Sequence, residues 1–399
     1  MRIALFTDTN IHYTDGVGRI IRELIGYVSR IQQHSLLVFY RSDVAEQEQP
    51  LSANVAEYGV DAPYLPLPGY RQYPYFYLRS PRRRLLARVQ EFAPDIVLTV
   101  TPYVPRGIGR AGLDIGRRLR CPVGGSFDFP LTWGAEYYIK SNVPFEFARG
   151  LFRWHARFQM RVYRGCDVIL VPSAAMAQYV HDMYGDAPTI HFPRAVDSHQ
   201  FHPRHRSQAF RERLGLAGKV VVLFVGRLAL EKNLLALADA YQQVKEHHAE
   251  AALLFVGEGP VREALEQRRL SDVRFAGPLR GQDLLDAYAS ADVFAFPSVA
   301  DAGPMVILEA MASGLPALVQ HEGGGRDCVT DGRSGFVAKQ PVEFAVHLEQ
   351  LVGDAQLRSR MGREARADAE AFSWENVWPD VIGGLEEVVA SRGISPVAG

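Results

Sequence analysis

The sequence has few cysteines, no long hydrophobic run and almost no net charge. Its three cysteines, Cys121, Cys166 and Cys328, lie far apart without metal-ligand spacing, which excludes a cysteine-bound metal module and favours a reducing intracellular compartment. No run of about 18 apolar residues occurs, and the start lacks the apolar region of a signal peptide, so we expect a cytoplasmic protein. The formal net charge of -1 gives no general attraction to nucleic acid, and we expect no nucleic-acid partner.

The chain is long enough for two domains. Its 399 residues exceed what one hydrophobic core usually supports. Short apolar runs alternate with helical patterns in both halves, which is typical of doubly wound α/β domains with parallel sheets. The segments expected to form buried strands are 2–8, 35–40, 95–100 and 167–173 in the first half, and 219–227, 251–257, 272–277, 292–298 and 316–320 in the second.

The domain boundaries follow from where this alternation stops. Residues 190–205 lose the periodicity and gather Pro, His and Ser, which suits a linker. We expect an N-terminal domain over 1–190, a C-terminal domain over 191–375, and a helix over 376–399 that packs back on the first domain. Ligands of such folds bind at the carboxyl ends of the strands, so a cleft between the halves is the expected site.

Two cations follow the first strand of the second half, in the stretch LFVGRLALEKN. Arg227 comes directly after Gly226 at the strand end, and Lys232 comes five residues later, before a helical segment. A guanidinium and an ammonium beside a helix N-terminus can bind a polyanion such as a diphosphate. A solvated surface pair is the alternative interpretation.

The stretch VADAGPMVILEAMASGLPAL places a carboxylate inside an apolar helix. Gly303 can cap this helix, Pro304 suits its first position, and Gly314 with a following proline ends it after about ten residues. Asp301 then precedes the helix and Glu309 lies in its second turn. A carboxylate there is costly to desolvate unless it is hydrogen-bonded, so a ligand with several hydroxyls would be a fitting partner. A Glu satisfied by backbone or by an arginine is the alternative.

Three further segments have a possible function. Gly16, in TNIHYTDGVGR, lets backbone approach a ligand at a helix N-terminus, although the dinucleotide fingerprint is incomplete. Glycines 323–325 form a possible anion nest, or a flexible turn. The basic tract 79–89, after a tyrosine-rich run, could touch anionic lipid, or it could be a solvated helix face.

These motifs together resemble the family 4 retaining glycosyltransferases of GT-B fold, which have two Rossmann-like domains. The resemblance rests, in order, on DGVGR, FVGRLALEKN, FVGEGP, FPSVADAGPMVILEAMASGLPAL and GGGRDCVTDGRSGFV. It covers nearly the whole chain and is strongest over 219–337. It implies an enzyme that takes a nucleotide-diphosphate sugar, from UDP or GDP, as donor and a hydroxyl acceptor, possibly membrane-linked, as partner.

The resemblance also implies roles for individual residues. Arg227 and Lys232 would bind the diphosphate, Glu309 the ribose and Asp301 the donor sugar. Arg194 and Asp197 match an interdomain segment of the family. The catalytic set would be Arg227, Lys232 and Asp301, and the donor contacts would be those three with Gly16, Gly226, Gly303, Met305, Val306 and Glu309.

The sequence departs from the family pattern at three places. The family's Glu-Thr-Phe-Gly reads Asp-Ala-Gly-Pro at 301–304, and Pro304 removes one backbone N–H from the sugar pocket. Ser126 and Asp128, expected on the acceptor side, lie in SFDFP where relatives have a histidine. Asp327 replaces a glutamate after the glycines.

The implied reaction retains the anomeric configuration and needs no metal or other cofactor, and the chain has no Asp-x-Asp motif. Two other function classes remain open from the sequence. A catalytically degenerate GT-B chain could act as a nucleotide-sugar-binding or partner subunit. An epimerase or hydrolase on the same fold is less favoured, because a retaining hydrolase wants two carboxyl groups about 5–5.5 Å apart.

Overall fold

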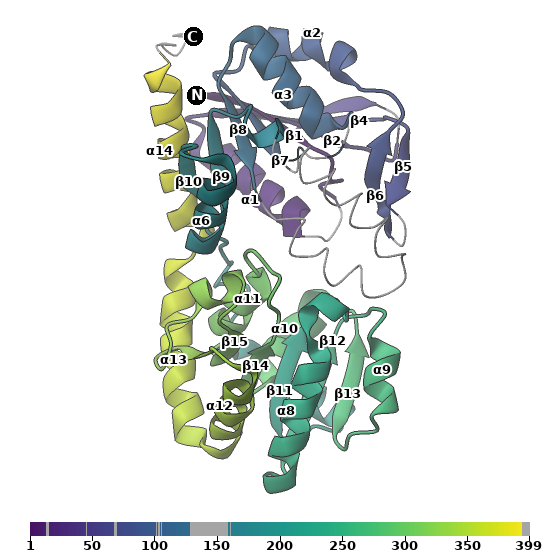
Figure 1. Ribbon diagram of the computed structural model, residues 1–399, viewed down its shortest axis with the longest axis vertical. Helices are drawn as coiled ribbons and strands as arrows, with labels where there is room; N and C mark the ends of the chain where they lie inside the picture. Colours follow the sequence, from purple (N-terminus) through teal and green to yellow (C-terminus); the bar gives the residue numbers. More distant parts are fainter. Residues whose placement is uncertain are drawn as a thin grey trace. The chain divides into compact units, whose positions relative to one another are not determined.

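The computed structural model describes residues 1–12, 16–44, 46–67, 70–100, 102, 104, 106–127, 159 and 161–392. Within this part the chain divides into two compact units (Figure 1). The first unit contains the described residues up to Phe192 together with 375–392, and the second unit is Pro193–Trp374. None of the helices in these ranges is both long and apolar enough to cross a bilayer.

The first unit is built on an eight-stranded sheet with the order β10-β9-β8-β7-β1-β2-β4-β3. Its pairs are parallel except for β3 against β4 at one edge. A separate antiparallel hairpin, β5 with β6, follows β4. The elements are β1 (Arg2–Thr7), α1 (Gly16–Ile31), β2 (Ser35–Arg41), β3 (Gln47–Pro50), β4 (Val55–Val60), β5 (Tyr64–Leu67), β6 (Tyr70–Tyr77), α2 (Arg82–Phe92), β7 (Ile96–Val100), α3 (Ile108–Leu119), β8 (Val123–Ser126), β9 (Val168–Val171), α6 (Ala174–Tyr184), β10 (Thr189–His191) and α14 (Trp374–Ser391).

The second unit is built on a six-stranded sheet, all parallel, with the order β13-β12-β11-β14-β15-β16. Its central strands are buried along almost their whole length, as expected when helices cover both faces. The elements are η1 (Pro203–His205), α7 (Gln208–Arg213), β11 (Val220–Val225), η2 (Leu230–Lys232), α8 (Leu234–His247), β12 (Ala251–Val256), α9 (Arg262–Gln267), β13 (Val273–Gly277), α10 (Gly281–Ser290), β14 (Val293–Phe296), α11 (Met305–Ala312), β15 (Ala317–Gln320), η3 (Gly324–Cys328), β16 (Gly335–Ala338), α12 (Pro341–Gly353) and α13 (Ala355–Ala371). The predicted α/β class with two parallel sheets is therefore confirmed.

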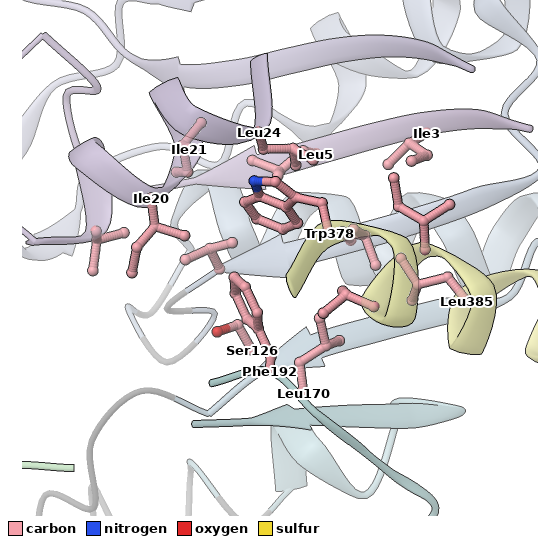
Figure 2. A pocket seen from close by; sticks show the side chains of 15 residues that line it. Ile3, Leu5, Ile20, Ile21, Leu24, Ser126, Leu170, Phe192, Trp378 and Leu385 are labelled. Carbon is pink, nitrogen blue, oxygen red and sulfur yellow. The ribbon is translucent and has the colours of Figure 1, made fainter. Parts of the chain in front are cut away.

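The C-terminal helix α14 covers one face of the first sheet together with α1. Trp378 is 2 % exposed, and its ring centroid lies 5.0 Å from that of Phe192. In Figure 2 the Trp378 indole extends from α14 toward Leu5 and Leu24, beside a small apolar cavity that these side chains line. Burial of these large side chains fixes α14 on this face, whereas α2 and α3 cover the other face (Figure 1).

A buried carboxylate joins β1 to α3 on that second face. Asp8 follows β1 directly and is 3 % exposed. Its carboxylate accepts hydrogen bonds from the backbone N–H groups of Ile108, at 2.7 Å, and Gly109, at 3.3 Å, in the first turn of α3. Burial is the largest influence and raises the pKa of Asp8 to about 7. The two amides, the Tyr77 phenol and the Arg41 guanidinium lower the pKa but do not offset the burial.

The raised pKa makes the stability of the first unit depend on pH. The folded state holds the Asp8 proton more tightly than the unfolded chain does, whose pKa is about 3.9. The stabilising contribution is therefore full below that value and is lost as the pH rises through about 7. Asp8→Asn has no proton to release at this position, so its free energy of unfolding should not show this loss. When the pH is raised from about 5 to about 8, we expect the unfolding free energy of the variant to increase by about 2 to 3 kcal/mol relative to that of the wild type. Urea unfolding at both pH values measures this gain.

A suitable control is Glu91→Gln on α2, because the Glu91 side chain is 75 % exposed. We expect its unfolding free energy to follow the wild-type pH profile. A constant difference between Asp8→Asn and the wild type across this range would contradict the assignment.

Candidate functional site

The loops after β11 and β14 bring together an ammonium and a carboxylate that are 69 residues apart in sequence. The two strands are parallel neighbours, so their carboxyl ends lie at the same edge of the sheet. Lys232 Nζ donates to Asp301 Oδ1 at 2.5 Å and to Oδ2 at 2.7 Å. The same nitrogen lies 5.6 Å from the centroid of the Phe296 ring at the end of β14. The Lys232 and Asp301 side chains are 15 % and 23 % exposed, so the pair lies close to the surface.

Arg227, the second expected cation, also forms an ion pair. Its guanidinium donates to the Glu231 carboxylate across one turn of chain. The Arg227 side chain is 38 % exposed, whereas that of Glu231 is 10 % exposed. The Ser298 hydroxyl donates to the backbone carbonyl of Glu231 at 3.1 Å and so ties η2 to the loop after β14. Glu231 was not expected as a partner from the sequence, although its spacing of four residues from Arg227 is a signal of such a pair.

Close backbone approach explains the glycines around these strand ends. Gly226 has φ of +150°, a conformation that side chains rarely adopt. A Cβ on Gly257, which follows the neighbouring strand β12, would lie 1.9 Å from the Gly226 carbonyl oxygen. The ends of β11 and β12 therefore pack backbone against backbone, and this places Arg227 at the edge of the sheet.

Glu309 lies on α11 and is 4 % exposed. Its Oε2 accepts a hydrogen bond of 2.7 Å from the phenol of Tyr288, which lies on α10 and is fully buried. Tyr288 is a partner that the sequence analysis missed, because nothing local links residues 21 positions apart. The predicted first helical position of Pro304 is wrong: Pro304 is the N-cap residue, with a ψ of 105°, and α11 begins at Met305. The helix has eight residues.

Two of the three glycines after β15 support the loop that carries Asp301. The Gly324 N–H donates to the Asp301 carbonyl oxygen at 2.6 Å. A Cβ on Gly324 would lie 2.1 Å from the Ala302 carbonyl oxygen, and one on Gly323 would lie 3.1 Å from the Asp301 carbonyl. These residues thus pack against the Asp301 loop. The Asp327 carboxylate lies 3.7 Å from the Arg326 guanidinium.

The expected donor residues Gly226, Gly303, Met305 and Val306 belong to the second unit together with the charged set. Gly16, by contrast, is the first residue of α1 in the first unit. No group of three His, Cys, Asp or Glu side chains able to hold a metal ion occurs in the described ranges.

The residues expected on the acceptor side lie in the first unit. Ser126 ends β8, is 5 % exposed and lines the apolar cavity beside Phe192 and Trp378 (Figure 2). Its backbone carbonyl accepts a hydrogen bond of 2.7 Å from the Tyr163 phenol. Asp128 lies outside the described residues.

Arg194 and Asp197, which were matched to an interdomain segment, belong to the second unit. Arg194 is 7 % exposed. Asp197 Oδ1 accepts hydrogen bonds from the N–H groups of His199 and Gln200, both at 2.9 Å, and so shapes the turn before η1.

Comparison with known families gives two matches that together cover most of the chain. The family described as Glycosyl transferases group 1 matches residues 219–354, and the one described as Glycosyltransferase Family 4 matches residues 14–200. Sulfoquinovosyl transferase SQD2 of Arabidopsis thaliana is 31 % identical over 391 residues, which cover 94 % of this chain and 71 % of the relative. A GDP-mannose-dependent alpha-mannosyltransferase of Mycolicibacterium smegmatis is 30 % identical over 400 residues, which cover 99 % of each chain.

Solved structures show the same fold. Sucrose-phosphate synthase from Thermosynechococcus elongatus superposes with a TM-score of 0.74 at 18 % identity, over 98 % of this chain and all of that one. HepE of Anabaena in complex with UDP-glucose gives a TM-score of 0.68 at 19 % identity, over 97 % of this chain and all of that one. These neighbours confirm the expected GT-B fold.

Proposed function

The chain belongs to glycosyltransferase family 4 and is a glycosyltransferase, and we propose that it transfers a sugar from a UDP- or GDP-sugar to a hydroxyl acceptor. We further propose that transfer retains the anomeric configuration and needs no metal ion. The observation that carries the proposal is that Arg227, Lys232 and Asp301 follow the neighbouring strands β11 and β14 of the second unit, with Glu309 on the helix after the second loop.

The chemistry of these side chains suits a nucleotide sugar. A diphosphate needs cationic donors, which the partly exposed Arg227 and Lys232 supply. Two relatives that match over nearly their full length are named GDP-mannose-dependent, and a structural neighbour was solved with UDP-glucose. The relatives are named as transferases. This favours an active enzyme for this chain over the alternative of a catalytically degenerate binding subunit.

Donor binding tests the assignment. Calorimetry with UDP, GDP, ADP and their sugar nucleotides should identify one base that binds tightly. Arg227→Ala and Lys232→Ala should each weaken this nucleoside diphosphate about 10- to 100-fold, because each removes a charge-assisted contact to phosphate. Glu309→Gln should also weaken binding, since a ribose hydroxyl loses its charged acceptor.

The matched control is Arg213→Ala on α7, where an exposed arginine pairs with Asp283. We expect unchanged nucleotide affinity in this variant. Equal affinity in Arg227→Ala, Lys232→Ala and the wild type would refute the phosphate role of both cations, and binding of no nucleotide by the wild type would overturn the donor assignment.

For the transfer step, we propose that the leaving diphosphate itself accepts the acceptor proton. The bond between C1 and the β-phosphate oxygen breaks, the acceptor oxygen bonds to C1 on the same face, and the acceptor proton passes to the diphosphate. Arg227 and Lys232 would stabilise the charge that develops on the leaving group. This scheme gives retention, and the two cations take the role that a divalent ion has in metal-dependent transferases.

The stereochemistry and the metal dependence can be measured in one assay. With an α-linked donor, the one-bond C1–H1 coupling of the product should be that of an α-glycoside, and the rate should not change with EDTA. A β-linked product would contradict retention. A rate that falls with EDTA and recovers with added Mg²⁺ would contradict metal independence.

We also propose that the acceptor is membrane-linked, with peripheral contact through the basic tract before and within α2. Some arginines of this tract already form ion pairs within the protein. Arg84 pairs with Glu46 at 2.6 Å, and Arg88 binds both oxygens of Glu48 at 2.6 and 2.7 Å. Among the described residues, Arg79 and Arg83 have no carboxylate partner. Leu78, beside Arg79, is 49 % exposed. A lipid contact would therefore use Leu78, Arg79 and Arg83.

Vesicle sedimentation tests this contact. Replacing both Arg79 and Arg83 with Gln should weaken binding to vesicles that contain anionic lipid by about tenfold or more, since each arginine near such a surface contributes about 1 kcal/mol. The control replaces Glu46 and Arg84 with Gln together, which removes an ion pair without changing net charge, and should bind as the wild type does. Equal binding of all three proteins would sink the proposal.

A further inference from the structure

Each cation of the diphosphate site is matched by a carboxylate of the same unit. Arg227 pairs with Glu231, and Lys232 pairs with Asp301. The four formal charges cancel, so a diphosphate does not meet two unopposed cations. It must share each of them with a carboxylate.

The two carboxylates are placed differently. The Glu231 side chain is 10 % exposed and lies within the same short turn as its arginine. The Asp301 side chain is more accessible, at 23 %, and it reaches Lys232 from another loop. The Gly324 N–H binds the Asp301 carbonyl at 2.6 Å, and this contact fixes the backbone of that loop. A phosphate on Lys232 therefore lies next to the negative charge of Asp301.

This proximity distinguishes the substrate from the product. The terminal phosphate of a free nucleoside diphosphate carries about −1.5 to −2 charges at pH 7, whereas the same phosphate in a sugar nucleotide carries about −1, because its second ionisable oxygen is bonded to the sugar. The Coulomb repulsion from Asp301 is thus larger for the product than for the donor.

We propose that Asp301 is a specificity-determining residue, whose charge makes the site prefer the sugar nucleotide over the free nucleoside diphosphate and so promotes product release. This inference rests on the proposed function, since it needs a nucleotide-sugar donor on Lys232. Transfer breaks the bond between C1 and the phosphate oxygen and leaves the electron pair on that oxygen. Once the acquired acceptor proton has dissociated to solvent, the extra negative charge lies beside Asp301.

The experiment compares dissociation constants for the nucleoside diphosphate and its sugar nucleotide, measured by calorimetry without acceptor. In Asp301→Asn we expect the diphosphate to bind about tenfold more tightly relative to the sugar nucleotide than in the wild type. Asp301→Glu keeps the charge and should keep the wild-type ratio within about twofold. The control Asp272→Asn removes a carboxylate paired with Lys219, at 2.9 Å, and Lys245, at 2.7 Å, before β13, and should leave the ratio unchanged.

The pH dependence separates this electrostatic role from a structural one. The terminal phosphate has its second pKa near about 6, so at about pH 5 the two ligands carry similar charge. The difference between Asp301→Asn and the wild type should therefore be small at pH 5 and full at pH 8. A lost contact between Asp301 and the sugar would instead change the ratio equally at both pH values.

The outcomes are distinct. If the wild type binds neither ligand, the proposed function fails. If the wild type binds both and the ratio is the same in Asp301→Asn at pH 8, or changes equally at both pH values, the inference alone is overturned. A changed ratio in Asp301→Glu as large as that in Asp301→Asn would also overturn it, because the charge would then not be the cause.

Discussion

The parallel arrangement of the second sheet is the constraint on which the site depends. All six strands run in one direction, so the loops after β11, β12, β14 and β15 meet at one edge. That edge holds the ion pair between Lys232 and Asp301, whose members are far apart in sequence. The glycines there serve the same arrangement, since Gly257 and Gly324 each lie where a Cβ would meet a neighbouring carbonyl oxygen. Side chains at this edge are therefore positioned by tightly packed backbone.

The sequence was sufficient to predict the features that arise from local pattern. Apolar runs predicted the parallel strands, and the positions of Arg227 after one strand end and of Asp301 before a helix were read from local pattern. Features that depend on tertiary contacts could not be predicted from the sequence. The phenol of Tyr288 satisfies Glu309 from another helix, and no local pattern predicts it. Pro304 was placed one position too far into α11, because its fixed φ suits both the N-cap and the first helical position.

Short glycine-rich and polar strands were also missed, for a physical reason. In β8 a Cβ on Gly124 would lie 2.7 Å from a Leu98 methyl carbon, and one on Gly125 would lie 2.8 Å from the Cys166 sulfur. The neighbouring side chains thus supply the apolar volume that the strand itself lacks. A hydrophobic pattern cannot reveal such a strand, since its core is contributed by other segments. β3 was missed for a different reason, because it is a mostly exposed edge strand, with the sequence QEQP, and needs no apolar residues.

Asp8 and Arg41 of the first unit are buried, whereas Arg227 and Lys232 of the second unit are partly exposed. This difference in exposure affects which unit can bind a charged ligand. In the first unit Asp8 is buried against the N-terminus of α3, and Arg41, 1 % exposed, pairs with Asp43 and donates to the Tyr64 phenol at 3.0 Å. Both groups are shielded from solvent and bonded within the fold. In the second unit Arg227 and Lys232 remain partly exposed. A polyanionic donor therefore fits the second unit, where partly exposed cations can contact a phosphate beside their carboxylate partners at modest desolvation cost.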